Sequence, residues 1–179
     1  HFCTYRKQPK SLHRLNILGL VSSGHPVNTG VFCFNSVLNV YASYHRKMID
    51  PNVLANLPET PDVIAPDGSE IRLLQSTQEG SSMVHALLHP ETTTHAVHHI
   101  TVEEAWVCVG GQGELWRKNS DGESVLKLNS GVSSEIPLGT TFQFRATGDT
   151  PLELVITTTP QWPGDHEAVR VEGKWKPSV

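Results

Sequence analysis

Residues 94–116 read THAVHHITVEEAWVCVGGQGELW, and this stretch decides the fold class. Two short apolar or alternating runs, 105–109 and 113–118, lie on either side of the pair Gly110-Gly111. Short runs of this kind joined by glycine are typical of a β-hairpin. No stretch of ten residues from residue 63 onward has a convincing helical period, so the pattern favours an all-β domain.

Similar runs recur at a spacing of roughly ten residues along the rest of the chain, bounded by Gly, Pro, Asn and Asp. We expect strands over 70–75, 83–89, 95–101, 105–109, 113–118, 124–128, 133–136, 141–146 and 152–158. Nine short strands in about 100 residues predict a β-sandwich or a β-barrel.

The charges divide the chain into two unequal parts. Residues 1–47 contain six Lys and Arg and no Asp or Glu, whereas residues 48–179 contain eight basic and 18 acidic residues, a net charge of −10. We expect 1–47 to be an N-terminal extension outside the core, either a targeting segment or an upstream extension. Residues 48–63 are then a lead-in, and 64–179 are the β-barrel with a C-terminal tail, 161–179.

The same charges restrict the partners that we expect. An acidic body argues against nucleic acid, because phosphates require a positive surface. Every apolar run, such as 17–21, is far shorter than the ~20 residues of a membrane-spanning helix, so we expect no membrane partner. We expect a cytoplasmic protein, or an exported or organellar one if residues 1–47 are a targeting segment.

Five of the ten histidines lie close together, within residues 85–99. They are followed by two adjacent glutamates, and the cluster consists of His85, His89, His95, His98, His99, Glu103 and Glu104. Imidazole and carboxylate groups are the ligands of nitrogen/oxygen sites for Fe, Mn, Cu, Ni or Zn. Alternate residues of a strand share a face, so His95 and His99 would point one way and His98 the other. The alternative is that these are surface histidines, with one or two of them hydrogen-bonded in the core.

The same residues resemble the first of the two motifs that define the cupins. That motif reads Gly, five residues, His, one residue, His, three or four residues, Glu, six residues, Gly. His99, Glu104 and Gly111 match its second His, its Glu and its last Gly. Val97 stands in place of the first His, and Glu91 in place of the first Gly.

The second cupin motif reads Gly, five residues, Pro, one residue, Gly, two residues, His, three residues, Asn. Gly131, Pro137 and Gly139 match at the right spacings, whereas Phe142 replaces the His and Ala146 the Asn. The resemblance covers about residues 64–160. It implies a single-domain jelly-roll barrel, also called a double-stranded β-helix, and at the family level a homodimer.

In metal-binding cupins the ligands are the two histidines and the Glu of the first motif and the His of the second. Only His99 and Glu104 carry over to this chain, so the resemblance implies a site that His95 or His85 must complete. Such a site would hold one divalent transition metal, with copper or iron somewhat favoured. The resemblance then implies an enzyme that acts on a sugar, another carbohydrate or a small organic acid, with oxidative or isomerase-type chemistry.

Loss of the metal site is the alternative. The barrel would then contain an aromatic-lined pocket formed by Val97, Trp106, Phe142 and Phe144, and the protein would bind or sense a small molecule without a metal. Equally, these side chains can simply fill the barrel, as interior side chains of small barrels usually do.

Overall fold

The computed structural model describes residues 56–76 and 80–179, so the predicted extension 1–47 and most of the lead-in lie outside the described residues. The regular secondary structure of the described residues consists almost entirely of β-strands. They are β1 (Val63–Ile64), β2 (Glu70–Ser76), β3 (Ser82–Leu88), β4 (Val97–His99), β5 (Glu103–Gly110), β6 (Gln112–Asn119), β7 (Gly122–Asn129), β8 (Ser133–Ile136), β9 (Thr141–Ala146), β10 (Leu152–Thr159) and β11 (Ala168–Arg170). A single 3-10 turn, η1 (Asp165–Glu167), precedes β11.

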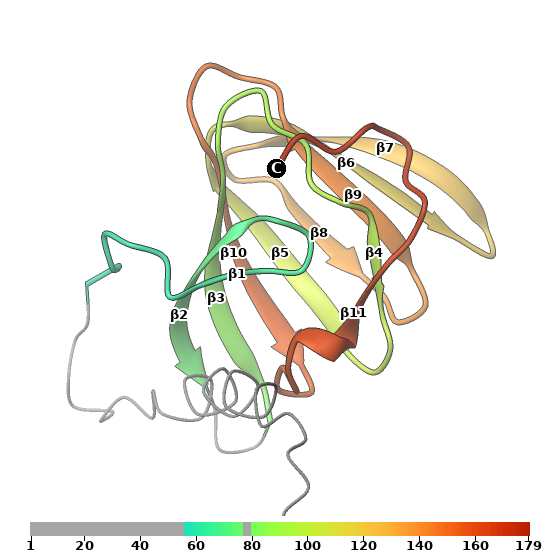
Figure 1. The fold of residues 1–179 in the computed structure, drawn as a ribbon, viewed down its shortest axis with the longest axis horizontal. Coiled ribbons are helices and arrows are strands. Elements are labelled where there is room, and N and C mark those ends of the chain that lie inside the picture. The colour runs from blue at the N-terminus through green and yellow to red at the C-terminus, as the bar shows by residue number, and fades with distance from the viewer. Residues whose placement is uncertain (1–55, 77–79) are drawn as a thin grey trace, which may run out of the picture. The chain divides into compact units, whose positions relative to one another are not determined.

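Two antiparallel sheets face each other and enclose the core (Figure 1). One sheet has the strand order β1-β2-β3-β10-β5-β8 and the other β11-β4-β9-β6-β7. Successive side chains of a strand point to opposite faces of its sheet. On β10, the buried Leu152 and Leu154 alternate with the less buried Glu153 and Val155. This arrangement confirms the predicted all-β jelly roll.

All nine predicted strands are present, and the largest difference is at the predicted strand 95–101, which is reduced to β4. Its two ends bond elsewhere. The backbone N–H of His95 donates to the carbonyl oxygen of Asp67, and the N–H of Ile100 donates to that of Glu167. The ladder therefore continues only through Val97 and His98, which pair with β9.

Within the described residues, no helix is long and apolar enough to cross a membrane.

The glycines that match the cupin motifs lie in turns that require them. Gly111, Gly131 and Gly139 have φ angles of 71°, 88° and 78°, a region that side chains disfavour. Glu91, which stands in place of the first motif glycine, also has a positive φ, of 57°. The departure from the motif therefore changes the residue and keeps the left-handed backbone.

From β11 onward the chain packs against the second sheet. β11 pairs with β4, so the segment at the red end of the colour scale runs beside β4 (Figure 1). Farther along, the side-chain amide of Gln143 in β9 donates to the carbonyl oxygens of Thr94 and Trp175, and its oxygen accepts the N–H of Trp175. Gln143 is fully buried although its neighbours on β9 face the core, because the tail covers the outer side of this strand.

We predict that Gly111→Ala destabilises the fold much more than Gly131→Ala. Both glycines have positive φ angles, but a Cβ at Gly111 would overlap the backbone carbonyl of Pro151, whereas a Cβ at Gly131 meets nothing within 4 Å. We expect a loss of about 3 kcal/mol or more for Gly111→Ala and about 1 kcal/mol for Gly131→Ala in urea unfolding. Equal losses would contradict this account of the β5–β6 turn.

Candidate functional site

A cavity lies inside the barrel, between the two sheets, and its walls are mostly apolar and aromatic. All four side chains of the predicted pocket line it: Val97, Trp106, Phe142 and Phe144. About 60 Å³ of its interior is open to the centres of water molecules, and one water needs roughly 10–15 Å³ on that measure. The barrel is thus not completely filled by its own side chains, and it has room for a small ligand.

The aromatic rings of the wall contact one another edge to face. Trp106 packs against Phe142 and Phe144 with ring centroids 5.5 and 5.2 Å apart, and the ring of His99 lies 5.1 Å from that of Phe142. Edge-to-face pairs at these distances are favourable and define the ring orientations. The wall is therefore a set of rings held in place by one another, from strands β4, β5 and β9.

Glu104 places a carboxyl group in this apolar cavity. Its Oε2 accepts a hydrogen bond of 2.8 Å from Nε1 of Trp106, two residues along β5. Burial, together with the nearby carboxyl of Asp67, raises the pKa of Glu104 to about 8, although the bond from Trp106 acts in the opposite direction. At neutral pH the side chain is therefore mostly protonated and uncharged, and it can donate as well as accept.

Asp67 is a second cavity carboxyl, and sequence analysis did not identify it. It lies in the turn between β1 and β2, and Oδ1 accepts hydrogen bonds from the backbone N–H and the hydroxyl of Ser69 at 2.9 and 2.7 Å. Burial raises the pKa of Asp67, although the bonds from Ser69 act in the opposite direction. In the sequence, Asp67-Gly68 indicates only a turn, and nothing local predicts that this turn borders the cavity.

His99 supplies the nitrogen of the site. Burial lowers the pKa of His99 to about 4, although the carboxylate of Glu167 acts in the opposite direction, so the ring is neutral at physiological pH. The residue is only 6% exposed, and within residues 56–76 and 80–179 Nδ1 of its ring has no hydrogen-bond partner. Most buried polar atoms in proteins are paired, so this unpaired nitrogen requires an explanation.

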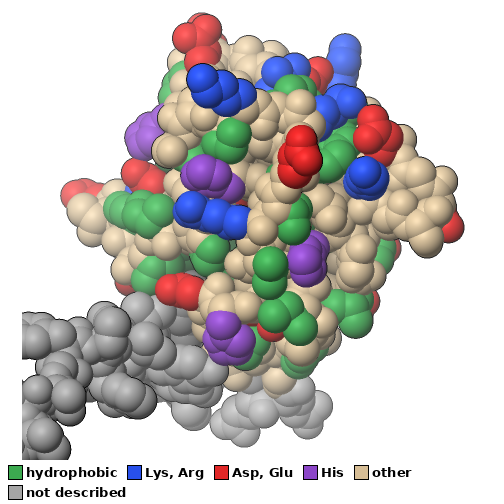
Figure 2. All heavy atoms as spheres, turned by 45° about the vertical axis from the view of Figure 1, so that its right-hand side comes forward, with side chains coloured by type: hydrophobic (Ala, Val, Ile, Leu, Met, Phe, Trp, Pro, Cys, Tyr) green, Lys and Arg blue, Asp and Glu red, His purple; other side chains and the backbone are tan. Residues whose placement is uncertain are grey.

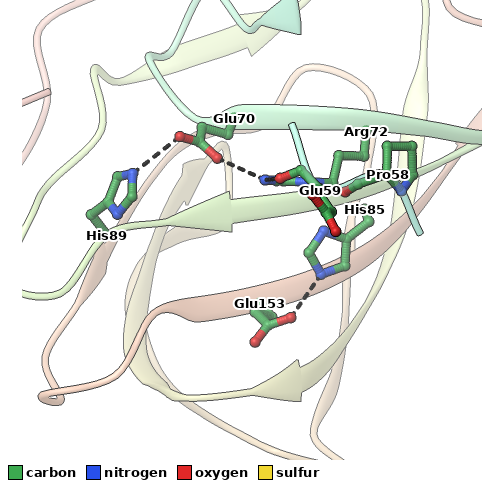
Figure 3. A network of polar contacts seen from close by, with 7 residues as sticks. All are labelled: Pro58, Glu59, Glu70, Arg72, His85, His89 and Glu153. Atoms are coloured by element: carbon green, nitrogen blue, oxygen red, sulfur yellow. Dashed lines mark hydrogen bonds and ion pairs between the residues drawn. The ribbon is translucent and has the colours of Figure 1, made fainter. Parts of the chain in front are cut away.

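The structure separates His85 from the cavity, which corrects the expectation that this residue could join His99 and Glu104. Val84 lines the cavity, so its neighbour on β3 faces the outer side of the sheet. There Nε2 of His85 lies 3.0 Å from Oε2 of Glu153 (Figure 3). The sequence pattern places His85 on one face of a strand, and it cannot by itself tell which face is inner.

The other clustered histidines also lie apart from the cavity wall. His89 is exposed and contacts Glu70 at 3.0 Å (Figure 3), and His98 is half-buried next to the buried His99. His95 contributes its backbone N–H to Asp67 but is not among the cavity-lining residues. Histidine side chains accordingly appear at several separate places on the face shown in Figure 2.

The side chains present do not fit the metal site that the cupin motifs imply. Among residues 56–76 and 80–179, no group of three or more His, Cys, Asp or Glu side chains is arranged to hold a metal ion. Oε2 of Glu104 already accepts a hydrogen bond from Nε1 of Trp106. His99 and Glu104 do line the same cavity, as expected. The other two motif positions hold Val97 and Phe142, whose side chains have no atom that can bind a metal.

We predict that Glu104→Gln flattens the pH dependence of stability between pH 6.5 and about 8. In this window the unfolded chain has lost the Glu104 proton while the folded protein keeps it, so the free energy of unfolding of the wild type falls as pH rises. Below pH 6.5 the lowered pKa of His99 contributes the opposite slope. A single titrating group changes the free energy of unfolding by at most about 1.4 kcal/mol per pH unit. Urea unfolding at pH 5, 6.5 and 8 measures the slope, with Glu103→Gln, at the exposed neighbouring position, as the control. Identical slopes for wild type and Glu104→Gln would contradict the raised pKa.

No protein-family model matches the chain. The xanthan biosynthesis protein XanB of Xanthomonas campestris pv. campestris is 36% identical over 81 residues, which is 45% of this chain and 16% of XanB. The chain thus spans about a sixth of the length of the curated relatives that it matches.

Several solved structures share the fold at low sequence identity. Recombinant oxalate oxidase in complex with glycolate has a TM-score of 0.54 at 20% identity, over 66% of this chain and 62% of the other. An uncharacterised protein with a double-stranded β-helix domain from Klebsiella pneumoniae has 0.52 at 18%, over 67% and 97%. The capsular polysaccharide assembling protein CapF of Staphylococcus aureus has 0.52 at 16%, over 67% and 34%. Together with the two facing sheets and the motif glycines, these likenesses identify the described part of the chain as a cupin-fold β-barrel.

Proposed function

We propose that this protein is a metal-free cupin that binds a small, uncharged, carbohydrate-type ligand in the barrel cavity. The observation that carries the proposal is Nδ1 of His99, a buried nitrogen without a partner on the wall of a cavity that has room for a ligand. A ligand that hydrogen-bonds to this atom removes the cost of leaving it unpaired, about 1–3 kcal/mol for a buried polar group.

The electrostatics of the cavity favour an uncharged ligand. His99 is neutral and Glu104 mostly protonated at physiological pH. An anion would be buried close to the carboxyl groups of Asp67 and Glu104, and a charge in an apolar enclosure is costly unless it is paired. Neutral hydroxyl groups avoid this cost, because they can bond to an imidazole nitrogen and to a protonated carboxyl.

A sugar has the surface that these walls require. One face of a sugar ring carries C–H groups that can pack on aromatic rings such as Trp106 and Phe142, and its hydroxyls can reach the polar side chains. The similarity to XanB, a protein named for xanthan biosynthesis, supports a ligand of this class. The cavity has room for a few water-sized groups, which suits a small ligand or one end of a longer one.

A metal-dependent enzyme acting on a sugar or a small organic acid is the second candidate. It is favoured by His99 and Glu104, which match ligand positions of the first cupin motif and line one cavity. It requires that Glu104 lose its proton and that a third side chain move into place, because the described side chains form no group of three. Metal analysis therefore distinguishes the two candidates.

The first experiment measures metal content and ligand binding on the same preparation of the full chain. After dialysis against a weak chelator, we expect far less than one transition-metal ion per chain by elemental analysis. Calorimetry with methyl glucoside, methyl mannoside and methyl galactoside should then detect binding to at least one, and weaker binding of the corresponding hexose 6-phosphates.

The matched variants are His99→Phe and His98→Phe. We expect His99→Phe to weaken hexoside binding roughly 3- to 10-fold, because it keeps the ring contact with Phe142 and removes the nitrogen. His98 faces away from His99 on the same strand, so its replacement should leave binding unchanged. Stoichiometric metal in the wild type, lost in His99→Phe, would instead establish the metalloprotein. No binding of any hexoside would overturn the proposed function.

A further inference from the structure

The chain after the last strand of the barrel forms part of the cavity wall. We call residues 161–170, between the end of β10 and the end of β11, the C-terminal strap. Two of its side chains, Trp162 and Ala168, line the cavity together with residues of both sheets. The strap begins with a hydrogen bond of 3.1 Å from the backbone N–H of Trp162 to the hydroxyl of Ser82 at the start of β3. It ends as β11, which pairs with β4 beside His99.

Glu167 holds the middle of the strap against the turn that follows His99. Its carboxylate accepts hydrogen bonds from the backbone N–H and hydroxyl of Thr101 and from the N–H of Val102, at 2.5, 2.8 and 2.9 Å. Burial opposes the ionisation of Glu167, but these bonds outweigh it and hold its pKa below the usual value. A buried carboxylate with three donors is a firm anchor, so the position of Trp162 beside His99 is built into the fold.

Trp162 and His99 present two unpartnered polar atoms from adjoining rings. The ring centroids are 5.2 Å apart at an angle of 78°. Both Nε1 of Trp162 and Nδ1 of His99 are buried and have no hydrogen-bond partner among the residues that the structure describes. The tryptophan nitrogen can only donate, whereas a nitrogen of a neutral imidazole donates or accepts according to the tautomer. A hydroxyl group satisfies both atoms in either tautomer, since it has one hydrogen and two lone pairs.

We propose that Trp162 and His99 together bind one hydroxyl group of the ligand, so that the C-terminal strap is a specificity-determining part of the site. This inference rests on the proposed function and deepens it, since it names the ligand group that the site recognises and a residue outside both cupin motifs that recognises it. Trp162 donates Nε1–H to the hydroxyl oxygen, and His99 forms the second hydrogen bond. A ligand that lacks a hydroxyl at this place leaves two buried nitrogens unpaired and binds more weakly.

The test compares Trp162→Phe with Trp116→Phe in calorimetric titrations with the methyl hexoside that binds the wild type. Phe at position 162 keeps an aromatic ring against His99 and removes only the N–H donor, whereas Trp116 is a buried tryptophan that does not line the cavity. We expect a roughly 3- to 10-fold increase in Kd for Trp162→Phe and no change for Trp116→Phe. Equal affinities of wild type and Trp162→Phe would overturn this inference and leave the proposed function standing. No binding to the wild type would overturn both.

Two further measurements extend the test. The first asks whether one hydroxyl binds both nitrogens, and the second needs no variant, so it applies even if Trp162→Phe does not fold. If both nitrogens bind the same oxygen, the double variant Trp162→Phe/His99→Phe should lose little more affinity than the weaker-binding single variant. Additive losses would overturn the shared hydroxyl. In the wild type, the NMR signal of the Trp162 indole N–H should shift on addition of the hexoside while that of Trp116 stays in place. An unmoved Trp162 signal in the saturated protein would overturn the inference without relying on any variant.

Discussion

Each side chain on β5 must point either into the space between the two sheets or out to the opposite surface, and the site depends on this constraint. Glu104, Trp106 and Cys108 take the inner direction, while Ala105 and Val107 are exposed. A carboxyl group therefore enters the barrel on the same strand face as a large aromatic ring, and the two bond to each other. A register shift of one residue would move both to the outer surface and leave the cavity without the Glu104 carboxyl group.

The chemistry of the site follows from burial rather than from charge. In water a glutamic acid is ionised and a histidine partly protonated at neutral pH, but inside this barrel both prefer the uncharged form. The cavity consequently offers a neutral acid and a neutral imidazole within an aromatic wall. Phe142 contributes to this outcome: it occupies the position of the second-motif histidine and brings an apolar ring where a metal-binding cupin has a ligand.

The sequence predicted the fold well, because strands and turns leave local signals. The nine strand positions follow from short apolar runs, and Gly111 and Gly131 match positions where the backbone needs a positive φ. Glu104, which matches the Glu of the first cupin motif, also lines the cavity. The positions of Asp67 and Trp162 left no such signal, since each belongs to an irregular segment whose path is set by tertiary contacts. The expectation for His85 failed for a related reason, because alternation assigns faces and not which face is inner.

Strand β9 carries cavity side chains on one face and the anchor of the C-terminal tail on the other. Phe142 and Phe144 face the cavity, while the buried amide of Gln143, between them in sequence, bonds to the backbone of Trp175. A change near Trp175 therefore reaches the cavity through a single strand without altering any residue of its wall. During evolution, the ligand preference of such barrels can change through substitutions and length changes after β10, a region that lies outside both cupin motifs.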